Sequence, residues 1–177
     1  TPKRAQYIRV LLTELTRIGS HLVWLGTHAM DLGATSVMLY CFREREEILK
    51  IFEMVSGQRM MTSYFRIGGL SAEPPPGWLD RVRKFVDAFP GHLREYEKLL
   101  TDNTIWRLRT VGIGVLKAED ALALGASGPV LRAAGVAYDV RKFFPYSSYE
   151  EFDFDVPTRT EADCYARYLV RLAEMRE

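Results

Sequence analysis

The chain has 177 residues, of which 47% are hydrophobic and 27% charged, and its 24 Lys and Arg against 23 Asp and Glu leave a formal net charge of +1. This composition is that of an ordinary globular protein, and a near-neutral chain without a basic run is not expected to bind nucleic acid. Cys41 and Cys164 form no CxxC motif, so their spacing indicates neither a zinc knuckle nor a redox pair. A reducing, cytoplasmic setting fits these two cysteines.

The length favours one hydrophobic core, so we expect residues 1–177 to form a single domain. The sequence begins with Thr1 rather than Met and ends at Glu177 inside a charged helical pattern. We therefore expect this domain to be a fragment of a longer chain.

The first 32 residues predict one long helix. Thr1 followed by Pro2 is a plausible helix start, and apolar residues then recur at spacings of three and four as far as Ala29. Gly33 is expected to end the helix. The apolar run at 18–42 is long enough to raise a membrane span, but its polar residues and glycines oppose insertion, so no transmembrane segment is expected.

Asp31 is the one formal charge between Ile18 and Phe42, and it ends a polar stripe at helical spacing. The stripe consists of Glu14, Arg17, His21, Trp24, His28 and Asp31. In so apolar a stretch we expect the Asp31 carboxylate to be buried and therefore paired, hydrogen-bonded or protonated. A proton relay and a structural acceptor are both open to it, although an anion near a helix C-terminus is electrostatically unfavourable.

A metal site on the same stripe is a weaker alternative. His21, His28 and Asp31 are acceptable ligands, but seven helical residues separate the histidines by about 10.5 Å, too far for one zinc ion. A hydrogen-bonded core histidine is the more usual case, so no metal is expected.

Gly19, Gly26 and Gly33 recur every seven residues and would lie on one flank of the first helix. Because glycine costs a helix about 1 kcal/mol, close packing of a second helix is the usual compensation. We expect tight packing there and no direct ligand role.

Later patterns predict further helices and one short β segment. The second helix should be capped by Thr35 or Ser36 and end near Gly57, with charged residues 43–50 as a solvated face of i,i+4 pairs. The remaining expectations are a strand or hairpin arm at 64–70, a loop at 71–77, a helix at 78–100 kinked at Pro90, a break at 101–103, an ambiguous stretch at 104–116, a short helix at 118–124, possible short strands within 130–154, and a helix from Thr160. The fold class is mainly α with a minor β excursion.

Several longer stretches are more specific than these patterns. They are IRVL at 8–11, THAMDLGA at 27–34, FRERE at 42–46, SGQRM at 56–60, FRIGG at 65–69, LRA at 131–133, DVRK at 139–142 and FDFDVP at 152–157. In this order, over essentially the whole chain, they strongly resemble the D-subunit family, also called the 49-kDa subunit family, of proton-pumping NADH-quinone oxidoreductase (respiratory complex I).

The resemblance implies a fold like the core of the nickel-iron hydrogenase large subunit, with the metal site lost and a quinone cavity in its place. This chain would be the central helical part of the subunit that forms that cavity. It would help couple quinone reduction to proton translocation, with ubiquinone or menaquinone as substrate, and would be inactive alone. The electrons would come from an iron–sulfur cluster held by the neighbouring small subunit, so no cofactor is expected on this chain.

The resemblance also implies roles for individual residues. Asp31 matches the acid that pairs with a quinone-site His, and that His, with a Tyr, lies upstream of Thr1. Thr27 and His28 would belong to the quinone cavity. Met61 stands near the cluster where many relatives carry a His, and because Met cannot titrate, a weaker pH dependence of the cluster's midpoint potential is expected.

The implied partners are other complex I subunits, especially the small iron–sulfur subunit and the quinone-channel membrane subunit. The implied location is the cytoplasmic face of the inner membrane, as a peripheral subunit. Two alternatives stay open: a large-subunit fragment of a related membrane-bound hydrogenase, which needs CxxC pairs outside this sequence, and a non-catalytic scaffold subunit.

Overall fold

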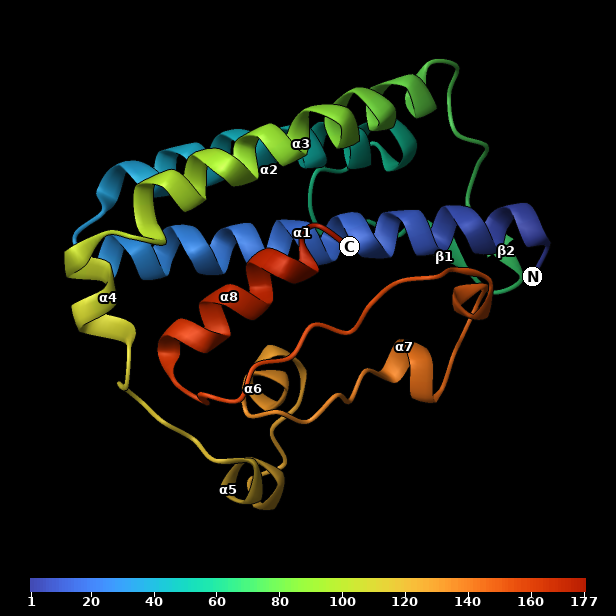
Figure 1. Cartoon of the computed structure of the whole chain (residues 1–177). Helices are drawn as coiled ribbons and strands as arrows, with labels where there is room; N and C mark the ends of the chain where they lie inside the picture. The colour runs from blue at the N-terminus through green and yellow to red at the C-terminus, as the bar shows by residue number, and fades with distance from the viewer. The chain divides into compact units, whose positions relative to one another are not determined.

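The computed structural model describes residues 1–177, and the chain is mainly helical with one small antiparallel hairpin (Figure 1). This confirms the predicted class of mainly α with a minor β excursion. By its internal contacts the chain divides into two compact units, Thr1–Arg94 and Glu95–Glu177, and the boundary falls inside one helix. That residues 1–177 form a single domain, as part of a longer chain, stays a prediction. No helix combines the length and the apolar character that crossing a membrane requires.

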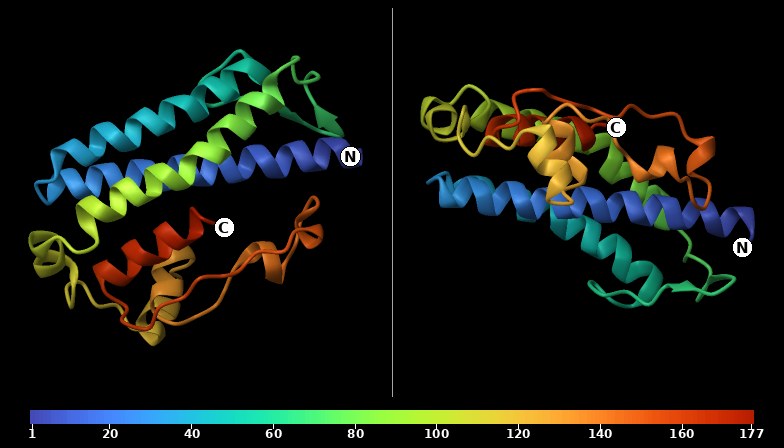
Figure 2. Two further views of the ribbon diagram at one scale, coloured as in Figure 1. Left: turned by 45° about the horizontal axis from the view of Figure 1, so that its top comes forward. Right: turned by 90° about the horizontal axis from the view of Figure 1, so that it is seen from below.

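Two long helices form the framework of the first unit. The helix α1 (Lys3–Asp31) and the helix α2 (Thr35–Ser56) lie side by side and are joined by a tight turn (Figures 1 and 2). Their facing sides supply the core, which includes the fully buried residues Leu22, Leu25, Ala29, Val37, Cys41, Ile48 and Ile51. The predicted helix of residues 2–32 is confirmed.

Glycine has two different uses along α1. A Cβ atom added at Gly26 would lie 3.2 Å from the Cα of Met38 and 3.3 Å from the Cβ of Cys41, so α2 approaches closest there. A Cβ at Gly19 would meet only the Cδ1 of Ile48, at 3.9 Å. Gly33 packs against nothing and instead ends the helix with a φ of 97°. The predicted close packing is therefore confirmed at Gly26, and Gly33 serves the chain reversal.

The turn between α1 and α2 is made by the backbone. Ala34 N donates to Ala29 O at 2.8 Å, and Val37 N donates to Ala34 O at 3.1 Å. The predicted capping by Thr35 or Ser36 is wrong, because Ala34 is the N-cap and no side chain caps α2. The backbone bonds already satisfy groups that a capping side chain would serve.

The hairpin and the next helix complete the first unit. Strands β1 (Phe65–Arg66) and β2 (Gly69–Leu70) pair antiparallel, which confirms the predicted β segment. The helix α3 (Trp78–Leu100) has the predicted bounds and continues through Pro90. Its first residue, Trp78, is buried, and its indole Nε1 donates to the carbonyl of Ile51 on α2 at 3.1 Å.

The second unit is built from short elements. They are α4 (Thr104–Thr110), α5 (Ala118–Ala123), α6 (Gly128–Ala133), α7 (Val140–Phe143), the 3-10 helix η1 (Tyr149–Glu151) and α8 (Cys164–Glu174), and α8 packs on α6 and α4. The possible strands within 130–154 are wrong, because helical turns occupy that stretch. Side-chain caps fix these turns: Asp139 accepts from the backbone N of Arg141 at 2.9 Å, and Asp163 accepts from that of Ala166 at 2.7 Å.

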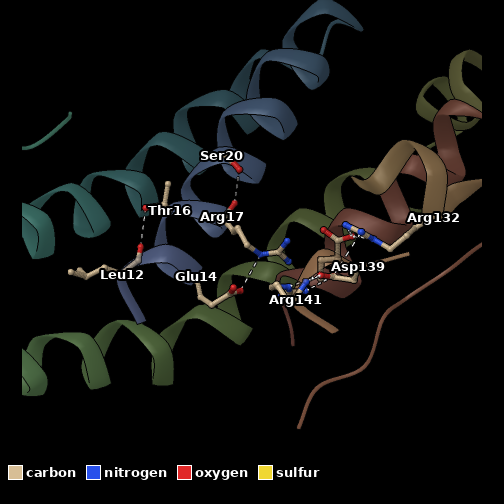
Figure 3. Close-up of polar contacts among 9 residues, drawn as sticks. Leu12, Glu14, Thr16, Arg17, Ser20, Arg132, Asp139 and Arg141 are labelled. Atoms are coloured by element: carbon tan, nitrogen blue, oxygen red, sulfur yellow. Dashed lines mark hydrogen bonds and ion pairs between the residues drawn. The ribbon is translucent and has the colours of Figure 1, made fainter. Parts of the chain in front are cut away.

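A buried ionic cluster joins α6, α7 and α8. Arg132 donates to Glu174 through Nε at 2.7 Å and also bonds the carbonyl of Tyr138 at 2.9 Å. Arg141 grips Asp139 with Nε at 3.0 Å and Nη2 at 2.7 Å, and Figure 3 shows this fork. All four charged side chains are at most 8% exposed, so each charge needs its partner.

Candidate functional site at the end of α1

The predicted quinone-site residues occupy the last two turns of α1. Thr27 and Asp31 are separated by four residues and therefore share one side of the helix. The Thr27 hydroxyl donates back to the carbonyl of Val23 at 2.9 Å, so it is held against its own helix. The structure thus brings Thr27, His28 and Asp31 together at one helix end.

Asp31 is exposed, so the predicted burial of its carboxylate is wrong. The buried residues Leu22, Leu25 and Ala29 form the apolar face of this helix end. Asp31 follows Ala29 by two positions, about 200° around an α-helix, and so points away from that face. No hydrogen bond or ion pair within the chain engages its carboxylate.

The electrostatics at this position favour a cation beside Asp31. Asp31 is the last residue of α1, where the helix dipole places partial negative charge, which disfavours an anion by about 0.3 to 1 kcal/mol. A protonated imidazole or guanidinium near Asp31 would relieve that repulsion. The arrangement is a carboxylate prepared to hold a proton donor.

His28 and Trp24 form a stacked pair on the adjoining side of α1. Their ring centroids are 4.8 Å apart with an angle of 23° between the planes. Further back on the same stripe His21 is buried, and Arg17 donates to Glu14 at 3.0 Å (Figure 3). The polar stripe predicted from the sequence is thus real, but its members pair with one another.

Metal binding finds no support in the side-chain arrangement. No group of three or more His, Cys, Asp or Glu side chains is placed to hold a metal ion. Neither Cys41 nor Cys164 is in a disulfide.

Met61 lies far from Asp31 within the first unit. The adjacent Thr62 lines a groove of about 300 Å³ together with Leu12 and Thr16 of α1. Asp31 follows Thr16 by 15 residues, which corresponds to roughly 22 Å at 1.5 Å per residue. Within this chain, the two predicted regions are therefore separate.

Met61 is the most exposed methionine of a strained segment. Its side chain is 92% exposed, and its φ of 54° is unusual for a residue with a Cβ. Such a conformation persists only where the neighbouring structure holds it. Nothing in the sequence signals this backbone conformation.

Sequence reasoning missed a buried ion pair between α2 and α3. Glu44 is only 4% exposed and lies 3.2 Å from Nε2 of His92, while Arg43 binds both Glu44 and, at 3.0 Å, Nδ1 of His92. The prediction that 43–50 is a solvated face is wrong at Glu44, because α3 packs over it. Long-range packing of this kind leaves no signal in the spacing of charges.

Comparison with known proteins places the chain in a class and then in a family. A model of oxidoreductase subunits described as "Respiratory-chain NADH dehydrogenase, 49 Kd subunit" matches residues 31–177. The chain belongs to this family.

Relatives agree over almost the whole chain. The first of two D-type subunits of the NADH-quinone oxidoreductase of Solibacter usitatus is 68% identical over 99% of this chain and 43% of its own length. The second D-type subunit of the Chloroflexus aurantiacus enzyme is 61% identical over 99% and 43%, and the D-type subunit of the Geobacter metallireducens enzyme is 55% identical over 99% and 45%. The chain spans less than half the length of these curated relatives.

Proposed function

We propose that this chain forms part of the quinone-reduction site of an NADH-quinone oxidoreductase and helps to couple electron transfer to proton translocation. The membership of its family and the names of its relatives support the enzyme. The observation that carries the site is Asp31, an exposed carboxylate at a helix end that its own chain leaves without a counter-charge. The hydrogenase-like core fold belongs to the same proposal.

The chain's own residues do not fit an iron–sulfur cluster. Such a cluster is usually bound by four cysteine thiolates, and this sequence has two cysteines, of which Cys41 is buried. The proposal therefore places the cluster on the neighbouring small subunit, where it supplies the electrons for quinone reduction. Contacts with that subunit and with the quinone-channel membrane subunit, on the cytoplasmic face of the inner membrane, are part of the same proposal.

Asp31 acts on a proton held by a partner imidazole. While the imidazole is protonated, the carboxylate pairs with it and stabilises the charge. When the imidazole gives its proton to the reduced quinone, Asp31 loses its counter-charge at an unfavourable helix end. The resulting change in electrostatic free energy falls on the turn from Gly33 to Ala34 and on the start of α2, which begin directly beyond Asp31. Thr27, one turn earlier, forms part of the cavity wall with His28.

The test is the intact complex carrying Asp31→Asn, which keeps the size of the side chain and removes its charge. We expect quinone reduction to fall by about tenfold or more, since positioned proton donors typically contribute at least that much. Asp87→Asn is the matched control, because Asp87 is also an exposed carboxylate on a helix of the first unit.

Assembly is checked by the iron–sulfur signals of each variant. Normal turnover and pumping in assembled Asp31→Asn enzyme would refute the proton role and leave Asp31 a surface residue. Loss of assembly in Asp31→Asn alone would favour a scaffold.

A further inference from the structure

The segment from Met60 to Ile67 presents apolar side chains outward. Met60 is 55% exposed, Met61 92%, Phe65 45%, and Ile67 fully exposed. The only regular structure here is the hairpin of β1 and β2, with two residue pairs, Phe65 with Leu70 and Arg66 with Gly69. A hairpin of this size is not stable alone, so other groups must hold it.

Arg9 of α1 supplies that hold. Its Nη2 donates to the carbonyl of Gly69 at 2.7 Å and also to the carbonyl of Arg66, so one nitrogen bonds both strands. Its guanidinium carbon also lies 5.8 Å from the ring centroid of Phe65. Arg9 is half-buried and makes no ion pair with a carboxylate of the chain, so its hydrogen bonds go to the hairpin.

The two flanks of the segment are fixed by different groups. Before Met61, Arg59 pairs with Glu46 and lies 3.4 Å from Glu53, both on α2. After it, the buried Tyr64 donates through its hydroxyl to the carbonyl of Ala72 at 2.7 Å. The left-handed backbone of Met61 is thus held between the α2 side and the hairpin.

We infer that Arg9 is a positioning residue for the exposed 60–67 segment, and that it sets the conformation in which Met61 and the hairpin meet the cluster-bearing subunit. This inference rests on the proposed function. Arg9 touches neither quinone nor cluster in it and acts through the hairpin. Small displacements of such a segment are costly, since a shift of about 1 Å far from the chemistry can slow a reaction by about 100-fold.

The experiment uses the intact complex with Arg9→Met and Arg9→Lys. Methionine keeps the length and apolar stem but removes every donor, whereas the lysine ammonium can still donate to both carbonyls. Arg4→Met is the control, because Arg4 is another arginine of α1, with its side chain 64% exposed in a surface pair with Glu73. Arg9→Lys also keeps the test open if Arg9→Met fails to assemble.

Two readouts are needed for each variant. Hydrogen–deuterium exchange of peptides covering 60–72 reports whether the hairpin is held. Quinone turnover with separate KM and kcat, together with the midpoint potential of the iron–sulfur cluster, reports whether the hold matters for the reaction. We expect faster exchange, about a tenfold loss of turnover and a shifted potential in Arg9→Met, partial recovery in Arg9→Lys, and no change in Arg4→Met.

Unchanged exchange in Arg9→Met would overturn the inference, because Arg9 would not hold the hairpin. Faster exchange with unchanged turnover and potential would also overturn it, because the hold would be structural only. The Asp31→Asn enzyme separates this failure from that of the proposed function: if Asp31→Asn loses turnover and Arg9→Met does not, the function stands and the role of Arg9 falls.

Discussion

Asp139 and Arg141 are two positions apart, yet this pair shows how a single buried carboxylate is kept ionised. Burial acts to raise the pKa of Asp139, but the side-chain and backbone hydrogen bonds from Arg141 and its positive charge outweigh burial and lower the pKa to about 2. The carboxylate is 4% exposed, so solvent screens these interactions little. The ionised form is therefore favoured in the folded state.

This lowered pKa predicts a pH dependence of stability. The stabilisation from Asp139, about 2 kcal/mol from its pKa, is present above the ordinary aspartate pKa and is lost as the pH falls towards the folded-state value of about 2. We expect Asp139→Asn to lower the free energy of unfolding of the chain at neutral pH, and the deficit to shrink below about pH 4. Denaturant unfolding at a series of pH values measures this, with the exposed Asp153→Asn as control. A deficit independent of pH would contradict the prediction.

Met61 gives a second prediction at this scale. Because a thioether does not titrate, replacing it by an imidazole in Met61→His should make the midpoint potential of the neighbouring cluster more strongly dependent on pH. Redox titration of the intact complex between about pH 6 and pH 8 compares the two slopes. Met54→His, on exposed α2 surface, is the control. Equal slopes in wild type and Met61→His would remove Met61 from the surroundings of the cluster.

The pairing of α1 with α2 depends on one missing side chain. At Gly26 an added Cβ would press on the backbone of Met38, whereas at Gly19 it would make an ordinary contact. We expect Gly26→Ala to destabilise the chain by about 1 kcal/mol, because overpacking costs about 1 to 3 kcal/mol and the helix gains only about 1. Gly19→Ala should be neutral or stabilising. Urea unfolding midpoints of both variants test this, and equal midpoints would show that α2 yields without cost.

The same elements show what a sequence can and cannot predict. The bounds of α1 and α3 and the ends near Gly33 and Gly57 follow from apolar spacing and glycine position, which are local signals. The failures are all non-local. The burial of Glu44 needs α3 above it, and the exposure of Asp31 needs the facing of α1 to be known.

At the scale of the molecule, the two units differ in how they are held. The first unit, residues 1–94, rests on long helices whose apolar faces meet, which is why periodicity predicts it. The second unit consists of helical turns of a few residues joined by buried ion pairs and capped by side chains. Periodicity has no length to act on there, so sequence patterns predict strands, or no definite element, for several of its short helices.

The candidate site divides along the same line. Thr27, His28 and Asp31 could be grouped from spacing alone because one helix carries them. Arg9 could not be linked to the hairpin, because 60 residues separate it from Gly69. Functional groups that meet through the tertiary structure need the structure to be found.

The presence of Pro90 inside α3 has a mechanical consequence. Proline has no backbone N–H, so the carbonyl of Val86 lacks its usual bond within the helix. This gap lies about one turn before Arg94, where the first unit ends and the helix passes into the second. The rod that both units share is therefore most compliant in bending close to their boundary, and a load applied to either unit is taken up there before it strains the packing of α1 against α2.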